Sequence, residues 1–165
     1  MLDLRIAHAT LPDGRQKMSI AVQGGRIAEV TEGLTADAHD TVDAGGLPLS
    51  PPFVDAHFHL DSALSYGQPR INDSGTLLEG IAIWGELIPH LTHDAIVERA
   101  LAYCDWAVAQ GLLAIRSHVD TSSASLLPVH ALLDVQKRVA PYLDRHLVAF
   151  PQDGVLRSPG GVQNL

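Results

Sequence analysis

The chain has only one cysteine, Cys104, in 165 residues. A single thiol excludes an internal disulfide framework, and it also excludes a structural zinc site made of several thiolates. The zinc nucleobase deaminases that use a Pro-Cys-x-x-Cys motif are excluded for the same reason. Any metal bound by this chain must therefore be held by histidine and carboxylate side chains.

Positive charge and long apolar runs are also scarce. Eleven Lys and Arg residues stand against nineteen Asp and Glu residues, for a formal net charge of −8. Nucleic-acid binding depends on clustered cations, so polymeric DNA or RNA is not expected as a partner. The N-terminus carries charges where a signal peptide has an apolar run, and no stretch reaches the roughly 18 apolar residues of a membrane span. These features predict a cytoplasmic protein that does not bind a membrane.

The composition is typical of a globular protein, with 46% hydrophobic and 18% charged residues. This is enough apolar material to form the core of one domain or one and a half. Alternating apolar residues in the first fifty residues predict short antiparallel strands, followed by a loop. A breaker-rich segment then marks a boundary, which divides the chain into a small β domain, 1–50, and a second domain, 51–165. The strands are expected at 2–8, 18–23 and 26–30, the loop at 31–43, and the breakers are Gly45, Gly46, Pro48, Pro51 and Pro52.

Beyond the boundary, apolar strands alternate with helical stretches, which is typical of parallel β/α units. Thr92 is expected to cap one helix and Gly111 to close it, while Pro128 suits the first turn of the next. Apolar residues at helical spacing predict one buried stripe on each of the first two helices: Leu77, Ile81, Trp84 and Ile88 on the first, and Val97, Leu101, Cys104 and Val108 on the second. The tryptophans Trp84 and Trp106 fit helix packing. The expected order is strand 53–59, helix 76–88, helix 93–110, strand 112–119, helix 126–139 and strand 146–150.

A pair of histidines, His57 and His59, ends the first of these strands. Residues two apart on a strand project from the same face, so both imidazoles can reach one metal ion while Phe58 points the other way. Parallel barrels carry their functional groups at the carboxyl ends of the strands, where this pair lies. From the spacing alone, a pair of surface histidines without a metal is an equal alternative.

The surrounding residues resemble a known family. Asp43-Ala-Gly-Gly followed by Pro51-Pro-Phe-Val-Asp-Ala-His-Phe-His-Leu-Asp61 is similar to the opening of the amidohydrolase superfamily, although many members have glycine where this chain has Pro52. The Pro-Pro-Phe variant resembles the bacterial cytosine deaminase branch. Further matches to that branch are Gly67-Gln-Pro69, Ser74-Gly-Thr-Leu77, Leu91-Thr-His-Asp94, Arg116-Ser-His-Val-Asp120, Val139-Ala-Pro141 and Val148-Ala-Phe-Pro-Gln152.

The resemblance implies specific roles at the matching positions. His57 and His59 match the first two ligands of one divalent metal ion, iron or zinc. Gln152 matches a glutamine that reads the substrate, since an amide can both donate to and accept from a pyrimidine edge. Leu77 matches a backbone contact to the ring. The alternatives are a loop glutamine that caps a backbone group and a core leucine at the start of its helix.

Three further residues could support these groups. His118 could hold a metal ligand or the substrate by a hydrogen bond, or it could be a buried histidine with satisfied partners. Asp61 and Asp120 could orient the histidines, or they could cap the turns that follow their strands.

The implied fold is the N-terminal part of a metal-dependent (β/α)8 TIM barrel, preceded by a small β-sandwich domain. The implied reaction is hydrolysis of cytosine, or a related nucleobase-like ring, to uracil and ammonia by a metal-activated water. The acid/base and the remaining ligands are expected beyond Leu165, so the chain alone should be inactive, and the full-length enzyme is expected to be a homo-oligomer. The alternatives are another cyclic amidohydrolase, acting on isoguanine, a triazine such as ammelide, or creatinine, and an inactive metal-binding or oligomerising fragment.

Overall fold

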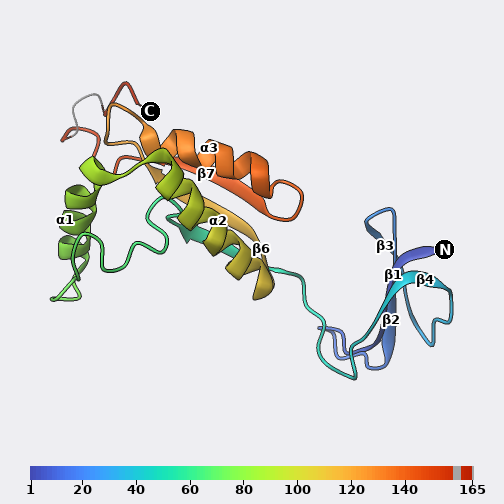
Figure 1. Cartoon of the computed structure of the whole chain (residues 1–165). Coiled ribbons are helices and arrows are strands. Elements are labelled where there is room, and N and C mark those ends of the chain that lie inside the picture. The colour runs from blue at the N-terminus through green and yellow to red at the C-terminus, as the bar shows by residue number, and fades with distance from the viewer. Residues whose placement is uncertain (158–160, 165) are drawn as a thin grey trace. The chain divides into compact units, whose positions relative to one another are not determined.

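The structure is a computed structural model that describes residues 1–157 and 161–164. The chain divides into two compact units, Met1–Pro51 and Pro52–Leu165, which are considered separately below (Figure 1).

The first unit is a four-stranded sheet in the order β3-β2-β1-β4. Its strands are β1 (Leu2–Ala9), β2 (Met18–Gln23), β3 (Arg26–Glu32) and β4 (Ala38–Asp43). Strand β2 pairs antiparallel with both β1 and β3, whereas β4 pairs parallel with β1. Buried side chains gather on β2, where Met18, Ile20 and Ala21 are each less than 5% exposed.

The prediction of a loop over 31–43 was wrong, because β4 lies within it. The strand reads Ala-His-Asp-Thr-Val-Asp and is almost entirely exposed, so it lacks the alternation of apolar residues by which strands are recognised. Its pairing comes instead from the backbone groups of β1. The expected antiparallel pairing of the first three strands is confirmed. Strand β4 adds a parallel pair with β1, and within the described residues this unit forms one sheet and not a two-sheet sandwich.

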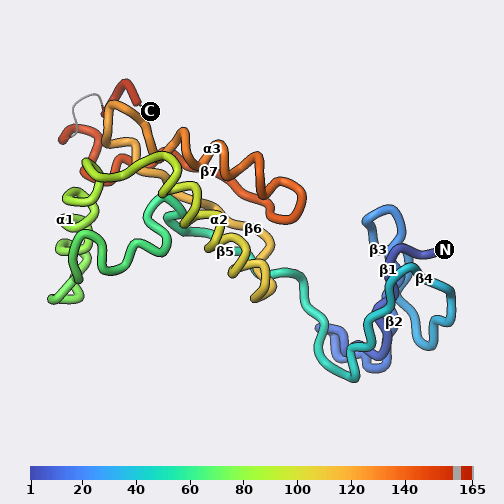
Figure 2. Tube along the Cα trace, viewed as in Figure 1, coloured from blue at the N-terminus to red at the C-terminus, as the bar shows by residue number. Residues whose placement is uncertain are grey.

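The second unit contains a three-stranded parallel sheet in the order β5-β6-β7, with helices in the connections. Its elements are β5 (Phe53–Phe58), α1 (Leu77–Leu87), the short helix η1 (Ile88–His90), α2 (His93–Ala109), β6 (Leu112–Asp120), α3 (Leu127–Val139) and β7 (Asp144–Phe150). The chain can be followed through these β/α units in Figure 2. The expected alternation of strands and helices is confirmed, and within the described residues the sheet has three strands and does not close into a barrel.

Local signals at the helix ends explain where the helices begin and stop. The Thr92 hydroxyl accepts a hydrogen bond from the Ala95 backbone N–H at the start of α2, and Thr76 does the same for Glu79 at the start of α1. Gly111 follows α2 with a φ of +84°, a conformation that favours glycine, and Pro128 lies in the first turn of α3. The predicted caps are thus confirmed.

The core of the second unit lies between the sheet and the helices α2 and α3, which lie side by side in Figure 1. Cys104 from α2, Ile115 from β6 and Leu132 from α3 are each 1% exposed or less. Leu101 and Val108, which were expected in the buried stripe of α2, are only partly buried. Val97 and Cys104 of the expected stripe are buried, and Ile96, Ala100 and Ala107 complete the buried side of α2.

Helix α1 packs differently from the sequence prediction. Its buried residues are Ile83 and Leu87, while Leu77, placed at the head of the expected apolar stripe, is 77% exposed. The alternative reading of Leu77 as a core residue is therefore wrong.

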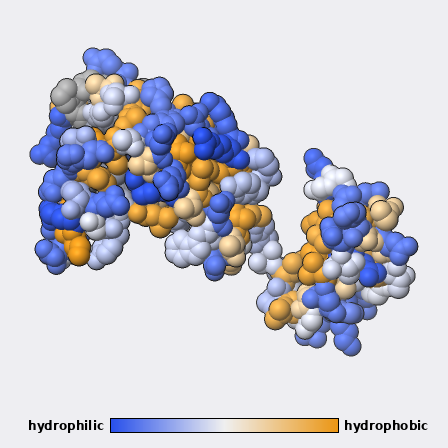
Figure 3. Space-filling view, viewed as in Figure 1, coloured by the Kyte–Doolittle hydropathy of each residue, from blue (hydrophilic) through white to orange (hydrophobic). Residues whose placement is uncertain are grey.

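The described residues contain no helix that is both long and apolar enough to cross a membrane. Hydrophobic side chains nevertheless interrupt the hydrophilic surface in Figure 3, and on the second unit the exposed ones include Phe53, Val54 and Trp106.

Candidate active site

The carboxyl ends of the three parallel strands bring histidines from different strands together. His57 and His59 come from the end of β5, with ring centroids 5.4 Å apart. His118, near the end of β6, lies 5.9 Å from His59 by the same measure. Phe150, the last residue of β7, meets all three rings edge-on. The predicted pair is thus part of a cluster of three imidazoles.

His118 contacts His57 by stacking. The two ring centroids are 3.9 Å apart and the ring planes differ by 16°. The Nδ1 atom of His118 is buried and has no hydrogen-bond partner among the described residues. The reading of His118 as a histidine with satisfied partners therefore does not hold at this nitrogen.

The protonation of His59 suits a metal ligand. Partial burial lowers the pKa of His59 below its usual value, and the nearby His57 and His118 lower it further. A histidine must be neutral to bind a metal, so a lowered pKa favours the binding form. Within the described residues, no group of three or more His, Cys, Asp or Glu is arranged to hold a metal ion. The described residues therefore do not form a complete metal site.

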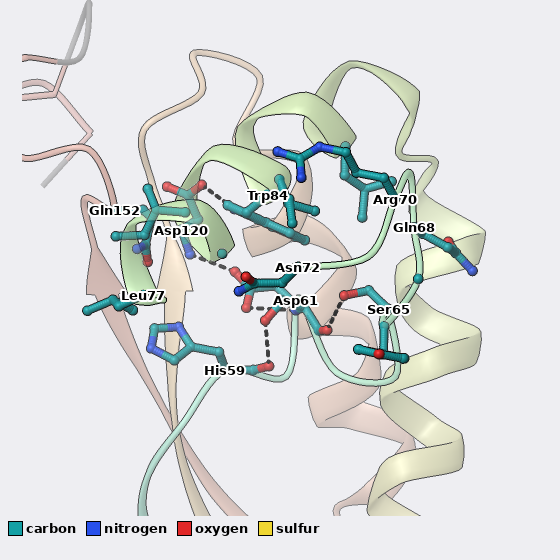
Figure 4. Close-up of a pocket in the computed structure, with 17 residues that line it drawn as sticks. His59, Asp61, Ser65, Gln68, Arg70, Asn72, Leu77, Trp84, Asp120 and Gln152 are labelled. Carbon is teal, nitrogen blue, oxygen red and sulfur yellow. Dashed lines mark hydrogen bonds between the residues drawn. The ribbon is translucent and has the colours of Figure 1, made fainter. Parts of the chain in front are cut away.

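A cavity of about 300 Å³ opens beside His59, between the strand ends and α1 (Figure 4). His59, Leu77 and Gln152, which belong to three different segments, all line it, and Asp61 and Asp120 contribute to its wall. The structure therefore brings five of the seven predicted site residues to one cavity. His57 and His118 are not among the lining residues and belong to the adjoining histidine cluster.

Asp61 and Asp120 are both buried and are joined through the backbone. The Asp120 N–H donates to Asp61 Oδ2 at 2.8 Å, and the Ser62 N–H donates to Asp61 Oδ1 at 3.0 Å. Burial raises the pKa of Asp61 to about 6, despite these hydrogen bonds. Asp120 accepts from the Ser122 N–H through Oδ1. Both carboxylates thus bond the turns after their strands, and within the described residues neither is hydrogen-bonded to a histidine ring.

Several residues at this cavity were missed by sequence reasoning. Trp84, assigned to helix packing, lines the cavity and donates its indole N–H to Asp120 Oδ2 at 2.9 Å. Arg70 also lines the cavity and pairs with Glu79 and Glu86 of α1. The pKa of Glu79 falls to about 2 because of hydrogen bonds from Ser74 and then from Arg70. The 77, 81, 84 spacing was a usable signal, because Leu77, Ile81 and Trp84 all face the cavity.

The histidine pair and the cavity lie at the carboxyl ends of parallel strands, which is where enzymes of this architecture carry their active sites. The model of the amidohydrolase family matches residues 40–164, and the chain therefore belongs to the amidohydrolase family. Members of this family are metal-dependent hydrolases.

Two solved structures match nearly the whole chain. One is 5-methylcytosine deaminase from Klebsiella pneumoniae with phosphonocytosine, with a TM-score of 0.89 and 36% identity over 97% of this chain and 40% of that one. The other is N-isopropylammelide isopropylaminohydrolase from Burkholderia multivorans, with a TM-score of 0.81 and 28% identity over 100% of this chain and 42% of that one. They confirm that the fold is the N-terminal portion of an amidohydrolase.

A curated relative gives the same coverage. N-isopropylammelide isopropyl amidohydrolase from Pseudomonas sp. (strain ADP) is 28% identical over 162 residues, which is 92% of this chain and 39% of that protein. The chain thus spans about two fifths of the length of each of these three proteins.

Proposed function

We propose that this chain supplies part of the metal site and the substrate-reading wall of an enzyme that deaminates cytosine, 5-methylcytosine or a related nucleobase-like ring. The observation that carries the proposal is the shared cavity, where His59 from the β5 end meets Gln152 from the segment after β7 and Leu77 of α1. The similarity to a 5-methylcytosine deaminase at 36% identity supports the pyrimidine class. The complete activity belongs to a full-length protein that provides the remaining strands.

His57 and His59 are proposed to hold one divalent ion, iron or zinc. Their donor atoms are borderline imidazole nitrogens, which suit both metals. When bound, the metal lowers the pKa of a water so that hydroxide is available near neutral pH. The chain's own contribution is to keep His59 neutral by burial and to fix the plane of His57 against His118.

Gln152 and Leu77 are proposed to orient the ring. A glutamine amide matches the neighbouring carbonyl and ring N–H of a pyrimidine, because it has one acceptor and one donor in one plane. Leu77 lies at the N-terminal end of α1, where its backbone can approach a ring in the cavity. In the reaction, water adds to the sp2 carbon that bears the amino group, and the carbon–nitrogen bond breaks to release ammonia. The proton transfers require an acid/base, which we place in the later strands.

The direct test is release of ammonia from cytosine and 5-methylcytosine by the full-length, metal-loaded protein. We expect turnover by that protein, and none by residues 1–165 alone. Metal-dependent turnover by residues 1–165 would show that the acid/base does lie within this chain. No turnover of any pyrimidine by the full-length protein would refute the substrate class.

A second candidate has its own support. Two proteins that act on N-isopropylammelide match at least 92% of the chain at 28% identity. Ammelides are cyclic amidines like cytosine, so the same cavity could present the exocyclic nitrogen to water. Release of isopropylamine from N-isopropylammelide, without release of ammonia from cytosine, would favour this candidate and leave the family assignment intact.

A further inference from the structure

The wall of the cavity opposite the strands is helix α1, and its attachment to the sheet is slight. Its first residues, Leu77 and Leu78, are 77% and 78% exposed, and its buried residues, Ile83 and Leu87, lie in its second half. Glu79 and Glu86 bond to Arg70 and Ser74, which belong to the loop before the helix. These bonds join α1 to its own loop, so helix and loop can move together.

One side-chain hydrogen bond reaches from α1 to the sheet within the described residues. It joins Trp84 Nε1 to Asp120 Oδ2, at 2.9 Å. Figure 4 shows the indole over the cavity with its N–H aimed at the Asp120 carboxylate, which projects from the end of β6. A hydrogen bond to a carboxylate is stronger than one between neutral groups, particularly where water is excluded.

Asp120 is itself held by other parts of the site. Its backbone N–H donates to Asp61, two residues after His59. Its Oδ1 accepts from Ser122, whose hydroxyl accepts from the Asp153 N–H, next to Gln152. Asp120 therefore links the segment that carries the histidine pair with the segment that carries the predicted substrate-reading glutamine.

We propose that Trp84 is a positioning residue, whose indole N–H fixes α1 to Asp120 and so sets the distance of Leu77 from His59 and Gln152. The effect on substrate binding rests on the proposed function, because it assumes that the ring binds between these three residues. The role of Trp84 in holding α1 against the sheet is independent of the proposed function. Loss of the hydrogen bond leaves α1 tied to its loop but free to move away from the strands.

Hydrogen exchange tests the attachment without any substrate. Trp84→Phe retains the aromatic ring and removes only the indole donor, and Trp106→Phe is the matched control because Trp106 is 59% exposed on α2. Loss of this hydrogen bond to a carboxyl group should raise the opening equilibrium of α1 about tenfold or more. We expect that increase at the backbone amides of 81–87 in Trp84→Phe, and no change there in Trp106→Phe. Equal exchange in the two variants would overturn the proposal.

A second measurement uses the intact hydrogen bond, in case Trp84→Phe unfolds. In Trp106→Phe the indole proton of Trp84 is the only one of its kind, since the chain has two tryptophans. We expect this proton to exchange with water at least about ten times more slowly than a reference indole proton. The reference is the indole proton of Trp106 in the Trp84→Phe protein. If that variant is unfolded, the reference is the indole proton of a free tryptophan peptide. Exchange as fast as the reference would show that the bond is absent in solution.

Steady-state kinetics of the full-length enzyme separate positioning from a general loss of structure. A displaced Leu77 weakens ring binding, so Trp84→Phe should raise KM about tenfold and leave kcat within about twofold. A fall in kcat with unchanged KM would contradict the assigned role. If the enzyme turns over no pyrimidine, the proposed function fails, and the exchange measurements still decide whether Trp84 holds α1.

Discussion

Two adjacent leucines on α3 allow a sharp test of the core of the second unit. Leu132 is 1% exposed and packs in the core between α3 and the sheet, whereas its neighbour Leu133 is 41% exposed. Both lie within the same helix, so Leu→Ala has the same small effect on helix propensity at either position. The difference between the two variants therefore isolates the contribution of burial.

The loss of unfolding free energy expected for Leu132→Ala follows from the atoms that the substitution removes. Leu132→Ala deletes three buried carbons, worth about 0.8 kcal/mol each, or about 2.4 kcal/mol together. A residual cavity on the order of 60 Å³ adds about 1.4 kcal/mol at about 24 cal/mol per Å³. Leu132→Ala should thus lower the free energy of unfolding by about 4 kcal/mol, and Leu133→Ala by less than about 1 kcal/mol.

Urea unfolding, followed by far-ultraviolet circular dichroism, measures both values. The midpoint should fall strongly for Leu132→Ala and little for Leu133→Ala, with similar slopes. Equal losses at the two positions would mean that α3 does not pack on the sheet as described. The placement of β6 and β7 under this helix, and with it the site at their ends, would then be wrong.

Three further predictions concern the site and the buried thiol. His59→Ala should reduce bound metal in the full-length protein to background, as measured by elemental analysis after dialysis, whereas His39→Ala, at an exposed position of β4, should retain it. Gln152→Ala should lower kcat/KM for cytosine about 10- to 100-fold, because the ring loses its paired hydrogen bonds; an unchanged value would remove Gln152 from the substrate site. Burial raises the pKa of Cys104 to about 11 from its usual 9, so its contribution to stability is full below pH 9 and is lost as the pH rises through 11. Unfolding measured from pH 8 to 11 should show a smaller fall in stability for Cys104→Ala than for the unchanged protein; parallel curves would contradict the shift.

The sequence predicted the second unit well because its signals are local. Thr92 and Gly111 mark the ends of α2, and the apolar strands that become β6 and β7 need no knowledge of their partners. Strand β4 was missed for the opposite reason. Its residues carry no alternation, and it is a strand because β1 offers backbone hydrogen bonds from a part of the chain more than thirty residues earlier.

In the site too, features encoded within one segment were predicted, and contacts between different elements were not. The spacing of His57 and His59 was enough to place both rings together, and the resemblance brought Gln152 to attention. The stacking of His118 on His57 and the bond from Trp84 to Asp120 join different elements, and no spacing within one element encodes them. The apolar stripe of α1 was predicted from its spacing. Periodicity shows that residues share one face of a helix, but it does not show what that face contacts. In α1 the residues Leu77, Ile81 and Trp84 line the cavity.

The hydrogen bonds that close the site span long stretches of chain. The Leu60 N–H donates to Ser117 Oγ across 57 residues, and the Asp120 N–H donates to Asp61 across 59. Such closures lose chain entropy before they gain any contact, so they form late and slowly compared with a helix. A chain emerging from the ribosome can therefore fold α1 and α2 while His59 still lacks its neighbours. On the role proposed for His57 and His59, the groups that surround a bound ion are brought together only when these strands have paired.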